Sequence, residues 1–214
     1  MKAIYRWKES MEKIWREGHL YVDTSNRRCK ELMNLVVTIE NPSKEDIDGP
    51  VNSLIKSNNW FYPSKEEIAE VMFKELHSPV YDYTYGGRIF NYANEIDQVN
   101  DFVIPLLESD PDSRRGVIAL YNPLKDAFLD RRNIPSAMYL YARMMNGKLH
   151  LTGCYRSVDF FFGWPANLYQ LYCVQKLLCK RLDLELGSIT LISNSAHLFE
   201  TTLDYIREIH GDIL

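Results

Sequence analysis

The chain has 214 residues, of which 46% are hydrophobic and 13% aromatic, a composition that excludes a disordered or fibrous protein. Domains usually run to roughly 100–200 residues, so we expect a single domain that covers residues 1–214. A formal charge of -4 gives no long-range attraction to nucleic acid or to an anionic membrane, so any phosphate site must be a local cluster of arginines.

The first third of the sequence carries two helix signals and one strand signal. Apolar residues recur at helical spacing over residues 3–17, which predicts an amphipathic helix. The apolar run at residues 35–39 is closed by Asn-Pro and predicts a strand. A second helix is expected over residues 64–76, because Ser64 can cap its start and Glu67 completes a capping box.

The middle of the chain predicts a loop, a helix and three strands. Residues 81–88 are rich in tyrosine and glycine and are expected to form a loop, and helical periodicity returns over residues 97–107. Strands are expected at residues 116–121, 137–145 and 148–155. An Asn-Gly dipeptide separates the last two strands, and this is the strongest short signal for a β-hairpin.

The last third predicts a long, mostly apolar and therefore buried helix over residues 165–182. A short buried strand at residues 188–192 and a final helix over residues 196–209 are expected to follow it. Antiparallel strands mixed with helices, without a regular βαβ rhythm, indicate an α+β fold in which helices flank a mixed sheet.

The compartment follows from the cysteines and from the absence of a long apolar run. No run approaches the roughly 20 apolar residues of a membrane span, and the N-terminal segment is interrupted by charges every few residues. We therefore expect a cytoplasmic protein with reduced thiols and no bound metal, since no cysteine pair has zinc-site spacing. The four cysteines are Cys29, Cys154, Cys173 and Cys179.

Two motifs and a histidine stand in a fixed order in the C-terminal half. Arg156-Ser-Val-Asp159 is followed by Gly163-Trp-Pro-Ala-Asn167, and His197 lies thirty residues further on. This order resembles the thymidylate synthase superfamily, in which an Arg-Ser-x-Asp turn, a Gly-x-Pro-x-Asn helix start and a His-x-Tyr recur. The resemblance implies the family's fold, a pyrimidine nucleoside 5′-monophosphate as ligand, and a homodimer with shared active sites.

Upstream segments extend the resemblance over most of the chain from about residue 60 to 205. Residues 112–115 read Asp-Ser-Arg-Arg and are similar to the family's paired arginines, and residues 83–90 are similar to its Tyr-Gly loop. Glu70 falls on the second expected helix. The architecture is similar to that of short archaeal members of the family.

The candidate phosphate ligands are arginines, because a guanidinium makes charge-assisted and often bidentate bonds to phosphate. Arg156 is expected at the end of a strand. The resemblance implies that Arg114 and Arg115 reach the phosphate held by the partner subunit. The alternative for this pair is a surface role, in which the two arginines form ion pairs with Asp110 and Asp112.

The remaining candidate ligands would hold the base and the sugar. Asn167 offers one acceptor and two donors that match the O4 and N3–H edge of uracil, although it could also be a plain helix cap. Ser157 could hold the phosphate and Asp159 the pyrimidine, or Asp159 could be a turn residue. His197 resembles the family's sugar-binding histidine or is structural, and Phe199 stands where the family has tyrosine, so a ribose or a modified sugar becomes possible.

The pattern breaks at the nucleophile. The family's catalytic cysteine falls on Ser136 in this sequence, and Ala137 replaces the adjacent histidine. A thiol can be tuned to a thiolate, whereas an alcohol needs a neighbouring base to react. Cys154 lies two residues before Arg156 on the same expected strand and is a second candidate nucleophile, or else a small buried hydrophobic residue.

Three functions remain open at this point. The first is an enzyme with chemistry that does not need the cysteine, such as N-glycosidic hydrolysis of the nucleotide, for which Glu70 could stabilise positive charge on the sugar. Glu70 could equally be a solvated helix charge. The second is methyl or hydroxymethyl transfer to C5 of UMP, dUMP or CMP with methylenetetrahydrofolate as cofactor. The third is a non-catalytic nucleotide-binding module.

Overall fold

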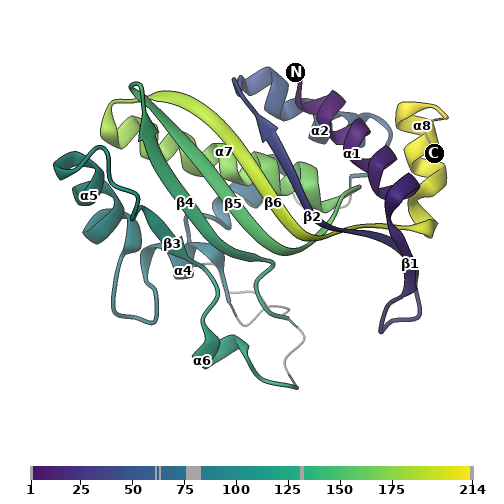
Figure 1. Cartoon of the computed structure of the whole chain (residues 1–214), viewed down its shortest axis with the longest axis horizontal. Helices are drawn as coiled ribbons and strands as arrows, with labels where there is room; N and C mark the ends of the chain where they lie inside the picture. The colour runs from purple at the N-terminus through teal and green to yellow at the C-terminus, as the bar shows by residue number, and fades with distance from the viewer. Residues whose placement is uncertain (1, 61, 63, 76–82, 131–132, 213–214) are drawn as a thin grey trace.

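Strands from both ends of the chain form one mixed sheet (Figure 1). The computed structural model describes residues 2–60, 62, 64–75, 83–130 and 133–212. Within these residues the sheet has six strands in the order β1-β2-β6-β5-β4-β3, and all neighbours are antiparallel except β5 and β6. The strands are β1 (His19–Val22), β2 (Arg28–Ile39), β3 (Val117–Ala119), β4 (Ala137–Met145), β5 (Lys148–Asp159) and β6 (Glu185–Phe199).

Helices flank the sheet, and the α+β architecture expected from the sequence is confirmed. Within the described residues, none of them combines the length and apolar character needed to cross a bilayer. The α-helices are α1 (Ala3–Glu17), α2 (Lys44–Lys56), α3 (Lys65–Glu70), α4 (Tyr85–Phe90), α5 (Ile104–Ser109), α6 (Pro123–Asp126), α7 (Gly163–Leu182) and α8 (Leu203–His210). A π-helical turn η1 (Gln98–Val103) precedes α5, and a 3-10 turn η2 (Glu200–Thr202) precedes α8.

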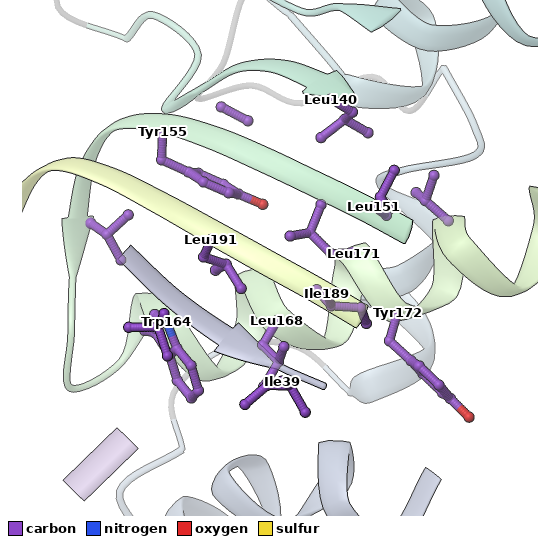
Figure 2. Close-up of a cluster of buried hydrophobic side chains, with 14 of the residues drawn as sticks. Ile39, Leu140, Leu151, Tyr155, Trp164, Leu168, Leu171, Tyr172, Ile189 and Leu191 are labelled. Carbon is purple, nitrogen blue, oxygen red and sulfur yellow. The ribbon is translucent and has the colours of Figure 1, made fainter. Parts of the chain in front are cut away.

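The long helix α7 packs on β5 and β6 and anchors the core (Figure 2). Its side chains Trp164, Leu168 and Leu171 are fully buried. A helix that is apolar around most of its surface must be buried, so the expectation of one long buried helix is confirmed. The buried amide of Gln175 also donates to the carbonyls of Leu149 at 2.8 Å and Gly187 at 3.1 Å, which ties α7 to both strands.

Three local signals in the sequence are confirmed. The helix predicted over residues 3–17 is α1. The hairpin between β4 and β5 turns at Asn146 and Gly147, whose φ angles of 52° and 73° are those that an Asn-Gly hairpin turn requires. The capping box at Ser64 and Glu67 forms at the start of α3 with both of its hydrogen bonds.

Two predicted elements near the site are corrected. Residues 196–199 belong to β6 rather than to the final helix, because they continue the ladder with β2 and β5 and alternate between buried and partly exposed positions. The expected loop at residues 81–88 contains the start of α4, which Thr84 caps; residues 81 and 82 lie outside the described part. A Cβ at Gly86 would lie 2.3 Å from the carbonyl oxygen of Lys74, so this helix can pack there only with glycine.

Several element boundaries also differ from the sequence prediction. The helix α3 ends at Glu70 and gives way to turns, and the helix expected over residues 97–107 is divided between η1 and α5. The strand expected at residues 35–39 begins seven residues earlier as β2, and β1 and α2 were not predicted. Gly49 and Pro50 lie inside α2 and are signals against a helix, which Ser43 nevertheless caps.

The sheet bends along one line that crosses its central strands. The buried positions change from odd to even numbers between Tyr155 and Val158 in β5, and between Ser193 and Ala196 in β6. In β2, Asn34 at the same level has a φ of 57°, a left-handed conformation that asparagine tolerates. Irregularities of the strand backbone that are aligned across a sheet change the direction in which the following side chains point. The bend therefore positions the residues that follow it on β5 and β6, where the candidate site lies.

Candidate functional site

Arg156 lies at the bend of β5, beside the segment that leads into β4. Its backbone N–H donates to the carbonyl of Ser136 at 2.8 Å. Its guanidinium donates from Nε to the carbonyl of Pro135 at 3.0 Å and from Nη2 to the carbonyl of Ile134 at 3.1 Å. An arginine has five N–H donors, so these two bonds fix the guanidinium and leave three donors for an anion. The side chain is partly exposed and can receive one.

Ser136, the residue expected at the position of the family's cysteine, lies directly against this arginine. Its hydroxyl donates to the backbone carbonyl of Ser157. Among the described residues, no imidazole or carboxylate forms a hydrogen bond to this hydroxyl. A serine needs such a base to act as a nucleophile, so its surroundings hold the Ser136 hydroxyl as a donor and do not activate it.

Tyr85 is a site neighbour that the sequence analysis did not single out. Its hydroxyl accepts a hydrogen bond from the backbone N–H of Ala137 at 3.2 Å, next to Ser136. Burial raises the pKa of Tyr85, and Arg156 acts in the opposite direction, so the phenol remains protonated and can donate at neutral pH. The available signal is the second tyrosine of the Tyr-Thr-Tyr-Gly run, whose tyrosines and glycines predict a loop.

Asp159 and His197 are brought together across β5 and β6, where they are direct register partners. The Asp159 carboxylate accepts from the backbone N–H of Phe161 at 2.9 Å and of Phe162 at 3.4 Å, so it also fixes the turn into α7. Burial raises the pKa of Asp159 and lowers the pKa of His197, while the attraction between the two groups opposes both shifts. Among the described residues, the buried Nδ1 of His197 has no hydrogen-bond partner.

Strand β2 adds a third residue, Glu31, to the row formed by Asp159 of β5 and His197 of β6. Glu31 of β2 is the register partner of His197, so two carboxylates flank the imidazole, one on each side. Ser195 donates its hydroxyl to Oε1 of Glu31. The ring of Phe199 meets the ring of His197 edge-on at 5.0 Å, and the guanidinium of Arg27 lies 4.0 Å from the centre of the Phe199 ring. No sequence signal identified Glu31, because the strand was not expected to reach it.

Asn167 lies in the second turn of α7, because the helix begins at Gly163. It is therefore not the cap of that helix, and its side-chain amide forms no hydrogen bond within the described part of the chain. The amide of Gln170, one turn further on, donates to the carbonyl of Ile68 at 3.0 Å and so ties α3 to this part of α7. Glu70 at the end of α3 is half-exposed and pairs with Lys74 at 2.8 Å, as the solvated-charge alternative predicts.

Arg114 and Arg115 are not brought to Arg156 within one chain. They precede β3 at the level of Arg143, whose guanidinium donates to the carbonyl of Ser113 at 3.2 Å. Arg156 lies at the opposite end of β4, six residues of strand away, which is roughly 20 Å. Both Arg114 and Arg115 are exposed and form no ion pair among the described residues, so the surface pairing with Asp110 and Asp112 is absent.

The outer face of the sheet, opposite α7, carries an exposed apolar surface. Met33, Val36 and Val117 expose 57%, 56% and 40% of their surface. A groove of about 560 Å³ lies on this face, and its lining consists of Val117, Tyr139, Tyr141, Thr152 and Ile192. Contiguous apolar surface of this kind marks a contact with another molecule. Cys154 is the register partner of Tyr139 and Ile192, and its thiol contacts Oδ1 of Asn194 at 3.7 Å.

Comparison with known proteins gives one family match and several archaeal relatives. The family model described as thymidylate synthase matches residues 51–210. A protein of Methanosarcina acetivorans named "Putative thymidylate synthase" is 31% identical over 203 residues, which are 95% of this chain and 89% of the relative. A protein of the same name from Methanosarcina mazei shows the same values. One from Methanocaldococcus jannaschii is 26% identical over 96% of this chain and 92% of its own length.

Proposed function

Because the chain belongs to the thymidylate synthase family, we propose that it is an enzyme that binds a pyrimidine nucleoside 5′-monophosphate and acts on it without a nucleophilic cysteine. The reaction we propose is hydrolysis of the N-glycosidic bond. Water adds to C1′ of the sugar, the bond from C1′ to N1 of the base breaks, and the products are the free base and the sugar 5-phosphate.

One observation carries this proposal, namely the state of Ser136. The family reaction begins with a thiolate that adds to C6 of the pyrimidine. Here a serine hydroxyl donates to the carbonyl of Ser157, and it has no base beside it in the described structure. An unactivated alcohol is almost entirely protonated at neutral pH, so addition to C6 should be very slow.

The groups that hydrolysis needs are still available around this position. The three spare N–H donors of Arg156 can hold the phosphate, and the unbonded amide of Asn167 can hold the base edge. Hydrolysis also needs a carboxylate that stabilises positive charge on the sugar, and Asp159 beside His197 can supply it. Glu70 remains a second candidate for this role if the nucleotide draws it away from Lys74.

We further propose that the active enzyme is a homodimer formed through the outer face of the sheet. The exposed apolar side chains and the groove on that face support this assembly. Arg114 and Arg115 are exposed, lack ionic partners in the described structure and lie far from their own Arg156. A two-fold related copy could place the pair at its neighbour's phosphate, and the sites would then be shared.

The second candidate function is C5 methyl or hydroxymethyl transfer with methylenetetrahydrofolate. The archaeal relatives favour this function, because they match most of this chain and are named "Putative thymidylate synthase". It requires Cys154 or Ser136 to replace the usual thiol. Cys154 is buried, and its thiol contacts Asn194 and not Ser136. It is therefore a poor replacement for the family's catalytic thiol.

The decisive experiment is to incubate the protein with UMP, CMP, dUMP and dCMP, with and without methylenetetrahydrofolate, and to analyse the products by mass spectrometry. Free base formed without folate supports hydrolysis. A C5 adduct formed only with folate supports transfer and overturns the hydrolysis proposal. Unchanged nucleotide with measurable affinity indicates a binding module, and no affinity for any of the four contradicts the nucleotide assignment itself.

A further inference from the structure

The three register partners Asp159, His197 and Glu31 include a carboxylate, Glu31, that none of the proposed chemistry uses. Glu31 stands opposite His197 in the antiparallel pair of β2 and β6, so the two side chains share a face at a Cβ separation of roughly 5 Å. Ser195 donates to Oε1 of Glu31, which fixes the carboxylate. Its other oxygen, Oε2, receives no hydrogen bond from the described residues, and the side chain is partly exposed.

Asp159, the carboxylate on the other side of His197, has one oxygen that accepts the backbone N–H groups of Phe161 and Phe162. The second oxygen of each carboxylate receives no hydrogen bond from the described residues. Of the two carboxylates, Glu31 is the one to which the proposed hydrolysis gives no role. His197 supplies the complementary group, because its ring stands between the two carboxylates and can donate or accept according to its tautomer.

The third side of this position is apolar. The Phe199 ring meets the His197 ring edge-on, and Arg27 covers the Phe199 face. Arg27 is held there by Asp23, which accepts from its Nε at 2.8 Å and pairs with its Nη2 at 2.7 Å. Residue 199 therefore offers no hydroxyl to a ligand, and the uncommitted hydrogen-bonding groups of this position are those of His197 and Glu31.

We infer that Glu31 and His197 together recognise the 2′,3′-diol of a ribose, so that the enzyme selects ribonucleotides over deoxyribonucleotides. This inference rests on the proposed function, since it names the sugar of the nucleotide that the site would hold. A diol presents two neighbouring hydroxyls, and a carboxylate beside an imidazole offers both of them a partner. A deoxyribose would satisfy one partner and leave the other unmatched. A site built to bond a hydroxyl discriminates strongly against the analogue that lacks it.

The test measures dissociation constants for UMP, dUMP, CMP and dCMP by calorimetry, with the unmodified protein and with Glu31→Gln. The unmodified protein should bind each ribonucleotide at least roughly tenfold more tightly than its deoxy counterpart. Glu31→Gln keeps the size of the side chain but removes its charge, so it should weaken ribonucleotide binding by roughly tenfold and change deoxyribonucleotide binding little. The matched control is Glu185→Gln, an exposed glutamate at the far end of β6, which should alter neither.

The readout is the ratio of the affinity for a ribonucleotide to the affinity for its deoxy counterpart. A merely structural role of Glu31 would leave this ratio unchanged. Equal affinity for UMP and dUMP in the unmodified protein would overturn the inference, as would a Glu31→Gln variant that loses both ligands equally. In either case the protein would still bind pyrimidine monophosphates, and the proposed function would stand. If none of the four nucleotides binds, the proposed function fails first and the inference fails with it.

Discussion

Replacement of Arg156 separates its role in the fold from its proposed role in binding. The guanidinium makes two hydrogen bonds to the carbonyls of Pro135 and Ile134, and it has three N–H donors to spare. Arg156→Ala removes the two hydrogen bonds to the carbonyls and the three spare donors together. Arg156→Lys keeps the charge but loses the planar fork that satisfies two carbonyls and an anion together.

The two effects have different expected sizes. Each hydrogen bond to a carbonyl contributes about 1 kcal/mol, so the free energy of unfolding should fall by about 1–3 kcal/mol in Arg156→Ala. A charge-assisted bond to phosphate contributes about 1.5–3 kcal/mol, so affinity for a pyrimidine monophosphate should fall by roughly tenfold to a hundredfold. Arg156→Lys should retain more of the affinity than Arg156→Ala while losing a similar amount of stability.

Urea unfolding and calorimetric titration with UMP or dUMP measure the two quantities independently. Arg16→Ala is the matched control, because Arg16 on α1 is 68% exposed and pairs with Glu12 and Glu17 of its own helix. It should leave affinity unchanged. A folded Arg156→Ala protein with undiminished affinity would refute the assignment of this arginine to the phosphate.

Three further predictions follow from the site and from the C-terminal helix. Mixing an Arg114→Ala, Arg115→Ala protein with Arg156→Ala should restore about one competent site per hybrid dimer; no recovery, or a monomer in sedimentation, would contradict shared sites. The unmodified protein should form no covalent complex with a 5-fluoropyrimidine monophosphate and folate, whereas Ser136→Cys should recover one; thymidylate made by the unmodified protein would show the reasoning to be wrong. Burial lowers the pKa of His210 from 6.5 to about 4. Because the unfolded chain then binds the proton more readily, stability should be lost as the pH falls from about 6.5 toward 4, by about 1–2 kcal/mol after allowance for partial exposure. His210→Gln should remove this part of the dependence in urea unfolding at pH 7 and pH 5, and an unaltered difference would count against it.

The features that could be predicted from the sequence are those with a local chemical cause. Asn146 and Gly147 can adopt positive φ angles at little cost, so their turn is visible from two residues. The capping box of Ser64 and Glu67 needs only four residues. The apolar character of α7 shows its burial directly, because its charged residues, Lys176, Lys180 and Arg181, fall only in its second half.

The features that could not be predicted depend on partners far away in the chain. Residues 196–199 are strand because β2 and β5 pair with them on both sides, and neither partner is visible in the local pattern. Glu31 and Tyr85 reach the site only through the register of β2 with β6 and the packing of α4. By contrast, Arg156, Asp159 and His197 could be singled out because they carry the motif of a family.

The differences from the family pattern lie where the reaction would occur. Arg156 and Asn167 are present, and each has donors to spare for a nucleotide. By the family resemblance, Ser136 stands where the cysteine that attacks the base is expected. Burial disfavours the charged form of both Asp159 and His197, and only the attraction between the two groups opposes that effect. Such a pair is costly to keep and useful where positive charge develops on a sugar, so its position beside the proposed sugar site favours hydrolysis over storage.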